Sequence, residues 1–206
     1  MDLHVYFAFV FATSIMIALP GPSVILTIAH SISFGRLHGI VTVAGATLGI
    51  AFQLLIAAIG LTSILNTVAG AFELFRWAGA AYLVYLGVKQ WKGANKPLEL
   101  VTSNMSKKNI FAQGVVVTIF NPKSLVFIAA FLPQFIEISR PLALQFIIIV
   151  PTFLVITFTV TSVWAITAGS ARRFLKSQRV VKAVSRTSGG LMILAGMGLA
   201  SARRSN

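Results

Sequence analysis

The chain has 206 residues, of which 57% are hydrophobic and only 10% are charged, and its mean hydropathy is +0.89. Soluble domains carry about 25% charged residues, so this balance excludes an ordinary soluble protein and indicates an integral membrane protein. The formal net charge is +13, but the basic residues fall mainly between apolar segments, which favours orientation in a bilayer over nucleic-acid binding. Cysteine is absent from the sequence, which excludes disulfides and thiol catalysis, and we expect neither a cofactor nor a metal.

Six apolar segments are long enough to cross a bilayer. They cover residues 5–29, 39–65, 70–88, 110–132, 142–169 and 184–202. The first segment has no Lys or Arg before Arg36, so we interpret it as a retained span and not as a signal peptide. The sequence therefore predicts an all-α membrane protein of the inner (cytoplasmic) membrane, with residues 1–206 forming a single transmembrane domain.

The basic residues predict the orientation of these spans. Most of them lie in the first, third and fifth connections, and the third contains a linker over 93–106. The positive-inside rule places these connections in the cytoplasm, where they can contact anionic lipid heads, and places both termini outside. Arg203 and Arg204 argue mildly against this orientation.

The two halves of the sequence, about 1–92 and 107–206, resemble each other. A shift of 100 residues sets Pro22 on Pro122 and the Ile-Ala pair at 28–29 on the pair at 128–129. Because each half holds three spans, the second copy enters the membrane from the opposite face. This pattern predicts two inverted three-helix repeats, which are common in secondary transporters.

Prolines interrupt the first and fourth spans. Pro20 and Pro22 flank a glycine, and Pro122 follows Asn121. A proline inside a helix costs about 3 kcal/mol, whereas the first position of a helix suits it. We therefore predict broken first and fourth helices, with half-helices beginning at Pro22 and Pro122 and with Asn121 as an N-cap. Simple kinks are the alternative.

A half-helix that begins inside the membrane leaves backbone N–H groups free and carries a partial positive charge. Two such ends suit a small anion, for which a carboxylate is the obvious candidate. Lys123 lies within an apolar span and would pair with that anion, unless its side chain extends to the membrane surface. The predicted substrate-binding residues are Gly21, Pro22, Ser23, Gln53, Asn121, Pro122, Lys123 and Ser124.

Other polar residues have simpler interpretations. Thr157 and Thr161 share one face of the fifth span, where we expect ordinary helix packing. The glycines of the sixth span permit close helix packing or a homodimer. Glu73 and Arg76 are spaced to form an ion pair. The three histidines, which are His4, His30 and His38, are interpreted as interfacial residues near span ends.

Three motifs together are similar to those of the lysine-exporter (LysE/RhtB) family of amino-acid exporters. They are the early Pro-Gly-Pro, the Asn-Pro-Lys and the sequence FRWAGAAYLVYLGVKQWKG in the third span. The similarity covers essentially the whole chain. It implies export of amino acids or close derivatives across the cytoplasmic membrane, driven by the proton gradient.

Several alternatives stay open at this point. No carboxylate is evident within a span, so coupling would use His30 or Glu73 at greater depth, the ionisation of the substrate itself, or no proton at all. The chain could also export another small metabolite or ion, or act as a membrane partner protein without transport. A membrane enzyme would need a nucleophile–base pair that the spans do not show, and no nucleotide-binding loop supports ATP-driven transport.

Overall fold

The computed structural model describes residues 1–65, 69–95, 105–137, 139–170 and 178–201. Its side-chain description leaves out 61–65, 69–76, 95, 178–181 and 184. The predicted pair of Glu73 and Arg76 therefore lies outside the described side chains, as do Arg203 and Arg204.

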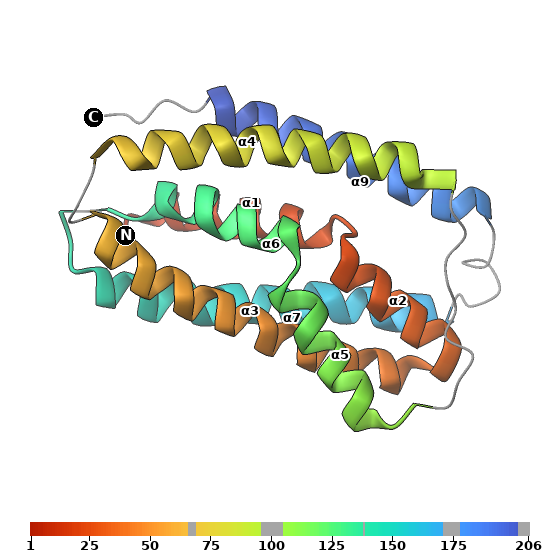
Figure 1. Ribbon diagram of the computed structural model, residues 1–206. Coiled ribbons are helices and arrows are strands. Elements are labelled where there is room, and N and C mark those ends of the chain that lie inside the picture. The colour runs from red at the N-terminus through yellow and green to blue at the C-terminus, as the bar shows by residue number, and fades with distance from the viewer. Residues whose placement is uncertain (66–68, 96–104, 138, 171–177, 202–206) are drawn as a thin grey trace.

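Every regular element in the described residues is helical. The elements are α1 (Leu3–Ala18), α2 (Pro22–Phe34), α3 (Arg36–Leu65), α4 (Ala69–Lys92), η1 (Gly93–Asn95), α5 (Lys107–Ile119), α6 (Pro122–Val126), η2 (Phe127–Phe131), η3 (Leu132–Phe135), α7 (Leu142–Ser170) and α9 (Gln178–Ser201). The long helices lie side by side along one axis, and α4 and α9 form an antiparallel pair on one side of the bundle (Figure 1). The all-α prediction is confirmed for this part of the chain.

The apolar helices are long enough to cross a membrane. Arg36–Gly60 within α3 and Leu142–Ser170 of α7 have mean hydropathies of 2.1 and 2.3 over their most apolar windows. Two bent helix pairs also qualify when each pair is counted as one span, so the described residues hold two to four candidate membrane spans. Helices α4 and α9 match the third and sixth predicted spans in position but are not among these candidates.

The predicted breaks in the first and fourth helices are confirmed. Helix α1 ends at Ala18 and α2 begins at Pro22, with a bend of 54° between them. Helix α5 ends at Ile119 and α6 begins at Pro122, and the segment through Phe135 is bent by 44° from α5. Both prolines occupy the start of a helix, because there the missing N–H removes no hydrogen bond.

Glycines allow two pairs of helices to touch backbone to backbone. Where α3 crosses α5, a Cβ on Gly114 would lie 2.6 Å from Thr42 O, and one on Gly45 would collide with Phe111 O. Where α4 crosses α9, a Cβ on Gly87 would lie 2.6 Å from the carbonyl oxygen of Gly189. Gly189 of the sixth predicted span thus serves packing within one chain, while the predicted homodimer stays a prediction.

His30 is more buried within the protein than we expected from the sequence. Its side chain is fully buried, and its Nδ1 is 2.8 Å from Thr42 Oγ1 of α3. His30 lies four residues before the end of α2, so the prediction that it lies near a span end stays open, but its side chain is enclosed by protein. Helix α2 runs alongside α3 after the sharp turn at Gly35, whose φ of 95° suits glycine, and this packing encloses the imidazole.

The α3–α5 crossing should tolerate no side chain at Gly114. We expect Gly114→Leu to lower the stability of the protein in detergent by about 1–3 kcal/mol or more, because the added atoms meet rigid backbone. The matched control is Gly198→Leu on α9, where a Cβ meets nothing within 4 Å. Melting temperatures from the loss of the monodisperse chromatographic peak on heating measure both. Equal melting temperatures for the two variants would contradict the close crossing.

Candidate functional site

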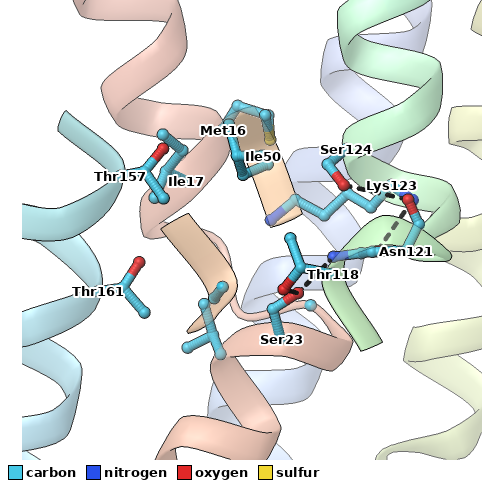
Figure 2. Close-up of a pocket in the computed structure, with 13 residues that line it drawn as sticks. Met16, Ile17, Ser23, Ile50, Thr118, Asn121, Lys123, Ser124, Thr157 and Thr161 are labelled. Atoms are coloured by element: carbon cyan, nitrogen blue, oxygen red, sulfur yellow. Dashed lines mark hydrogen bonds between the residues drawn. The ribbon is translucent and has the colours of Figure 1, made fainter. Parts of the chain in front are cut away.

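The two helix breaks border one small pocket. Its volume is about 40 Å³, and its walls come from α1, α2, α3, α5, α6 and α7 together with the residues at the breaks. Figure 2 shows Ser23, Thr118, Asn121, Lys123 and Ser124 gathered around it. The sequence predicted four of these five residues as binding residues, and Gly21 lines the pocket as well.

The break after α1 leaves carbonyl oxygens that cannot bond within the helix. Pro22, which would donate to Ala18 O in an unbroken helix, has no N–H. Side chains of other helices donate instead. The bonds are Trp164 Nε1 to Ala18 O at 3.2 Å, Gln90 Nε2 to Pro20 O at 2.6 Å, Ser188 Oγ to Pro20 O at 3.1 Å, and Lys123 Nζ to Leu19 O. Helices α4, α6, α7 and α9 are thereby tied to one break.

At the break after α5, carbonyl oxygens also accept hydrogen bonds from a side chain of another helix. Pro122 cannot donate to Thr118 O, which accepts from the backbone N–H of Asn121 at 3.0 Å and also from the side-chain amide of Gln53 on α3. Gln53 Nε2 lies 2.7 Å from Thr118 O and 3.0 Å from Ile119 O. Gln53 does not line the pocket, so the structure gives it a capping contact and not the binding position that we predicted from its depth in the span.

Hydrogen bonds between polar side chains join the two breaks to each other. Ser23 Oγ, at the start of α2, accepts from Thr118 Oγ1 at 3.0 Å and from Asn121 Nδ2 at 2.9 Å. Asn121 also caps α6, since its Oδ1 accepts from the backbone N–H of Lys123 at 3.1 Å. Ser124 Oγ donates to Asn121 O at 3.1 Å. This network holds the two half-helix starts in a fixed relation.

The side chain of Lys123 is only 5% exposed, so it does not extend to the membrane surface. It reaches across to the C-terminal end of α1, where its ammonium donates to Leu19 O. The negative end of the α1 dipole stabilises a cation at this place. Among the described residues no carboxylate pairs with it, because Asp2 and Glu137 both pair with Arg140.

The two half-helix starts differ in what they offer a ligand. The N-cap of α2 is Gly21, which has no side chain to accept from the first N–H groups, so the Ser23 and Val24 N–H groups have no partner within the helix. At α6 the first such N–H already bonds to Asn121. The predicted anion site with two equivalent helix ends is therefore reduced to one uncapped end, that of α2, beside Lys123.

Sequence reasoning missed part of the pocket wall. Thr157 and Thr161, which we interpreted as packing residues, line the pocket from α7 together with apolar side chains of α1 and α3. Their spacing of four residues, which places both on one face of a helix, was the available signal. Pro22 and Pro122 shape the breaks but do not line the pocket.

Paired helix breaks around a buried lysine define a class of multi-pass membrane protein with a polar site inside the helix bundle. Comparison with known proteins identifies its family. Residues 14–203 match the sequence model of the LysE type translocator family, and the chain belongs to this family. The similarity to the lysine-exporter family that the motifs indicated is thereby confirmed.

Curated relatives match over nearly their whole length. The homoserine/homoserine lactone efflux protein of Salmonella typhimurium is 32% identical over 204 residues, which cover 98% of this chain and 99% of that protein. The protein of the same name from Salmonella typhi is also 32% identical over 204 residues, with the same coverage. An uncharacterized membrane protein of Vibrio cholerae is 30% identical over 205 residues, or 98% of this chain and all of that protein. No solved structure matches this chain.

Replacing Gln53 should weaken the second break. In Gln53→Leu the carbonyls of Thr118 and Ile119 lose their side-chain donor inside the bundle, so we expect a loss of about 1–3 kcal/mol in stability. Phe52→Leu, at the exposed neighbouring residue of α3, is the control and should stay close to wild type. Thermal unfolding in detergent distinguishes them. Wild-type stability of Gln53→Leu would show that the cap is dispensable.

Proposed function

We propose that the protein is a secondary transporter that exports amino acids or close derivatives across the cytoplasmic membrane. The single observation that carries this proposal is the buried Lys123, which has no acidic partner among the described residues and faces a pocket between two helix breaks. A buried cation without a counter-ion is costly unless a ligand supplies one. The names of the Salmonella relatives, efflux proteins for homoserine and its lactone, support a small amino-acid-like substrate.

The carboxylate of the substrate binds Lys123 and the free N–H groups at the start of α2. One of the three N–H donors of the Lys123 ammonium is used by Leu19 O, which leaves two for the substrate. The hydroxyl groups of Ser23 and Ser124 and the amide of Asn121 lie at the same pocket. They offer further hydrogen bonds to the polar head of a zwitterion.

Transport requires the pocket to open. Its volume of about 40 Å³ is well below the roughly 300–1,000 Å³ of ordinary ligand sites. A conformational change in which one half of the protein moves relative to the other would expose the pocket first to the cytoplasm and then to the outside.

The packing of the helices supports the two inverted repeats. Helix α3, from the first half, packs along α5, whereas α7, from the second half, packs on α1 and α2. Each of these helices also caps the break of the opposite half, through Gln53 in one case and Trp164 in the other. On this basis we propose six membrane crossings, with both termini outside as the positive-inside rule indicates.

Removal of the Lys123 charge should strongly reduce export without preventing insertion. We expect Lys123→Met to weaken substrate binding by about 1.5–3 kcal/mol, or roughly tenfold or more, because a charge-assisted hydrogen bond is lost. Efflux of labelled L-homoserine and L-leucine from preloaded cells, at matched membrane abundance, is the measurement. Lys108→Met, at an exposed lysine at the start of α5, is the control.

The same measurement separates the proposal from its rivals. A membrane partner protein predicts no efflux above the vector control for wild type and a changed assembly in Lys123→Met. An exporter of another small metabolite or ion predicts no amino-acid efflux but normal assembly of both variants. Equal efflux by wild type and Lys123→Met would place the substrate site elsewhere in the molecule.

We further propose that the proton gradient drives export and that His30 carries the proton. His30 is fully buried, and its Nδ1 lies 2.8 Å from Thr42 Oγ1 of α3. The side chains of Gln113 of α5 and His38 of α3 also act on the ring, and His38 is the titratable group of these three neighbours. A buried imidazole on α2, the helix whose start borders the pocket, can couple its protonation to the position of that helix.

Measurements in liposomes can separate proton coupling from substrate transport itself. We expect His30→Gln to retain exchange of labelled for unlabelled substrate at equal pH but to lose the stimulation of efflux by an imposed pH gradient. His38→Gln, whose ring bonds to Phe34 O at 2.8 Å, is the control and should keep both activities. If His30→Gln kept the stimulation of efflux by the pH gradient, His30 would be excluded as the proton carrier. The proposed substrate site would not be affected by this result.

A further inference from the structure

A second and larger cavity adjoins the pocket at the helix breaks. Its volume is about 340 Å³, within the range of ordinary ligand sites, and it lies between α1, the α6–η2 segment, α4 and α9. Its walls are apolar, with Leu83, Phe127, Phe131 and Met192 among them, and the exposed side chains of Phe11 and Leu194 lie at its open side. Among the described residues, Lys123 is the one charged residue that lines it.

The pocket and the cavity share part of their walls. Met16 of α1 and Lys123 of α6 line both of them. Lys123 therefore lies where the small polar pocket meets the large apolar cavity. A ligand that fills both the pocket and the cavity has a compact anionic or carbonyl head group joined directly to a bulky apolar group.

The depth of Lys123 argues against a bilayer lipid as the natural occupant. Helix α1 has 16 residues, so its C-terminal end, which Lys123 contacts, lies about 24 Å from its start. Beyond the break, α2 continues the same span for 13 residues, or about 20 Å of helix. Lys123 therefore lies well inside the broken span, whereas a lipid phosphate stays at the boundary of the hydrocarbon region. A lipid chain could fill the apolar space but would leave the ammonium without an anionic partner.

We infer that this cavity is the side-chain subsite of the transporter, and that its substrates are amino acids or derivatives with a bulky hydrocarbon or aromatic side chain. This inference rests on the proposed export function and narrows its substrate class. The polar side chain of homoserine, the amino acid in the names of the Salmonella relatives, would gain little from these walls. Each additional buried methylene group favours binding by about fourfold, so the preference should be large.

The test uses the full chain reconstituted in liposomes, with exchange of four labelled probes: L-leucine, L-phenylalanine, L-homoserine and L-alanine. We expect apparent KM values for the two bulky probes at least about tenfold below those for the two small ones, since several more methylene or ring carbons are buried. Two variants fill the cavity from opposite walls, Ala12→Phe on α1 and Ala195→Phe on α9. Each should raise the KM for L-leucine and L-phenylalanine while leaving that for L-alanine close to wild type.

The control variant is Ala8→Phe, which adds the same ring to α1 at an exposed residue that does not line the cavity; it should retain the wild-type preference. Transport of the small probes without preference for the bulky ones would overturn the subsite and leave the export function standing. The subsite would also be overturned if the two cavity-filling variants changed the KM of all four probes equally, or changed none of them. If wild type exchanges no probe, the proposed function fails, and the subsite fails with it.

Discussion

Each proline at a helix break removes the backbone N–H that the carbonyl four residues earlier would have used. In a bilayer no water replaces it, so another part of the protein must supply the donor. Four side chains serve the break after α1, and Gln53 serves the break after α5. The arrangement of the bundle around its centre follows from this requirement, and it also brings Lys123 to the end of α1.

The caps connect the two halves of the protein. Gln53 extends from α3 to the break in the second half, and Trp164 extends from α7 to the break in the first. Gln90 and Ser188 join α4 and α9 to the carbonyl of Pro20, a residue adjacent to the pocket. A movement of the α4–α9 pair therefore acts directly on the chain at the first break, because it must carry Pro20 with it or break both bonds.

The features that were predictable from the sequence depend on local chemistry. Proline at the start of a helix and asparagine as its cap act within a few residues, so the breaks at Pro22 and Pro122 could be placed in advance. The role of Gln53 could not, because it depends on which helix its side chain faces. The burial of His30 was missed for the same reason, because α3 covers it only after the turn at Gly35 and nothing in its own segment indicates this. Thr157 and Thr161 share a face by spacing, but only the packed structure shows that this face borders the pocket.

The absence of a carboxylate beside Lys123 in the described residues has a physical advantage for a transporter of carboxylates. An acidic side chain would stabilise the buried ammonium strongly, and it would also compete with the substrate for the same donors. The Leu19 carbonyl and the negative end of the α1 dipole give a weaker stabilisation, from partial charges only. They lower the free energy of the site without substrate and do not neutralise the ammonium, so in the proposed transport cycle a carboxylate would gain a full charge interaction. Release on the far side, as proposed, would need this intermediate strength, because a permanent ion pair would exclude the substrate and an unsupported cation would hold it too tightly.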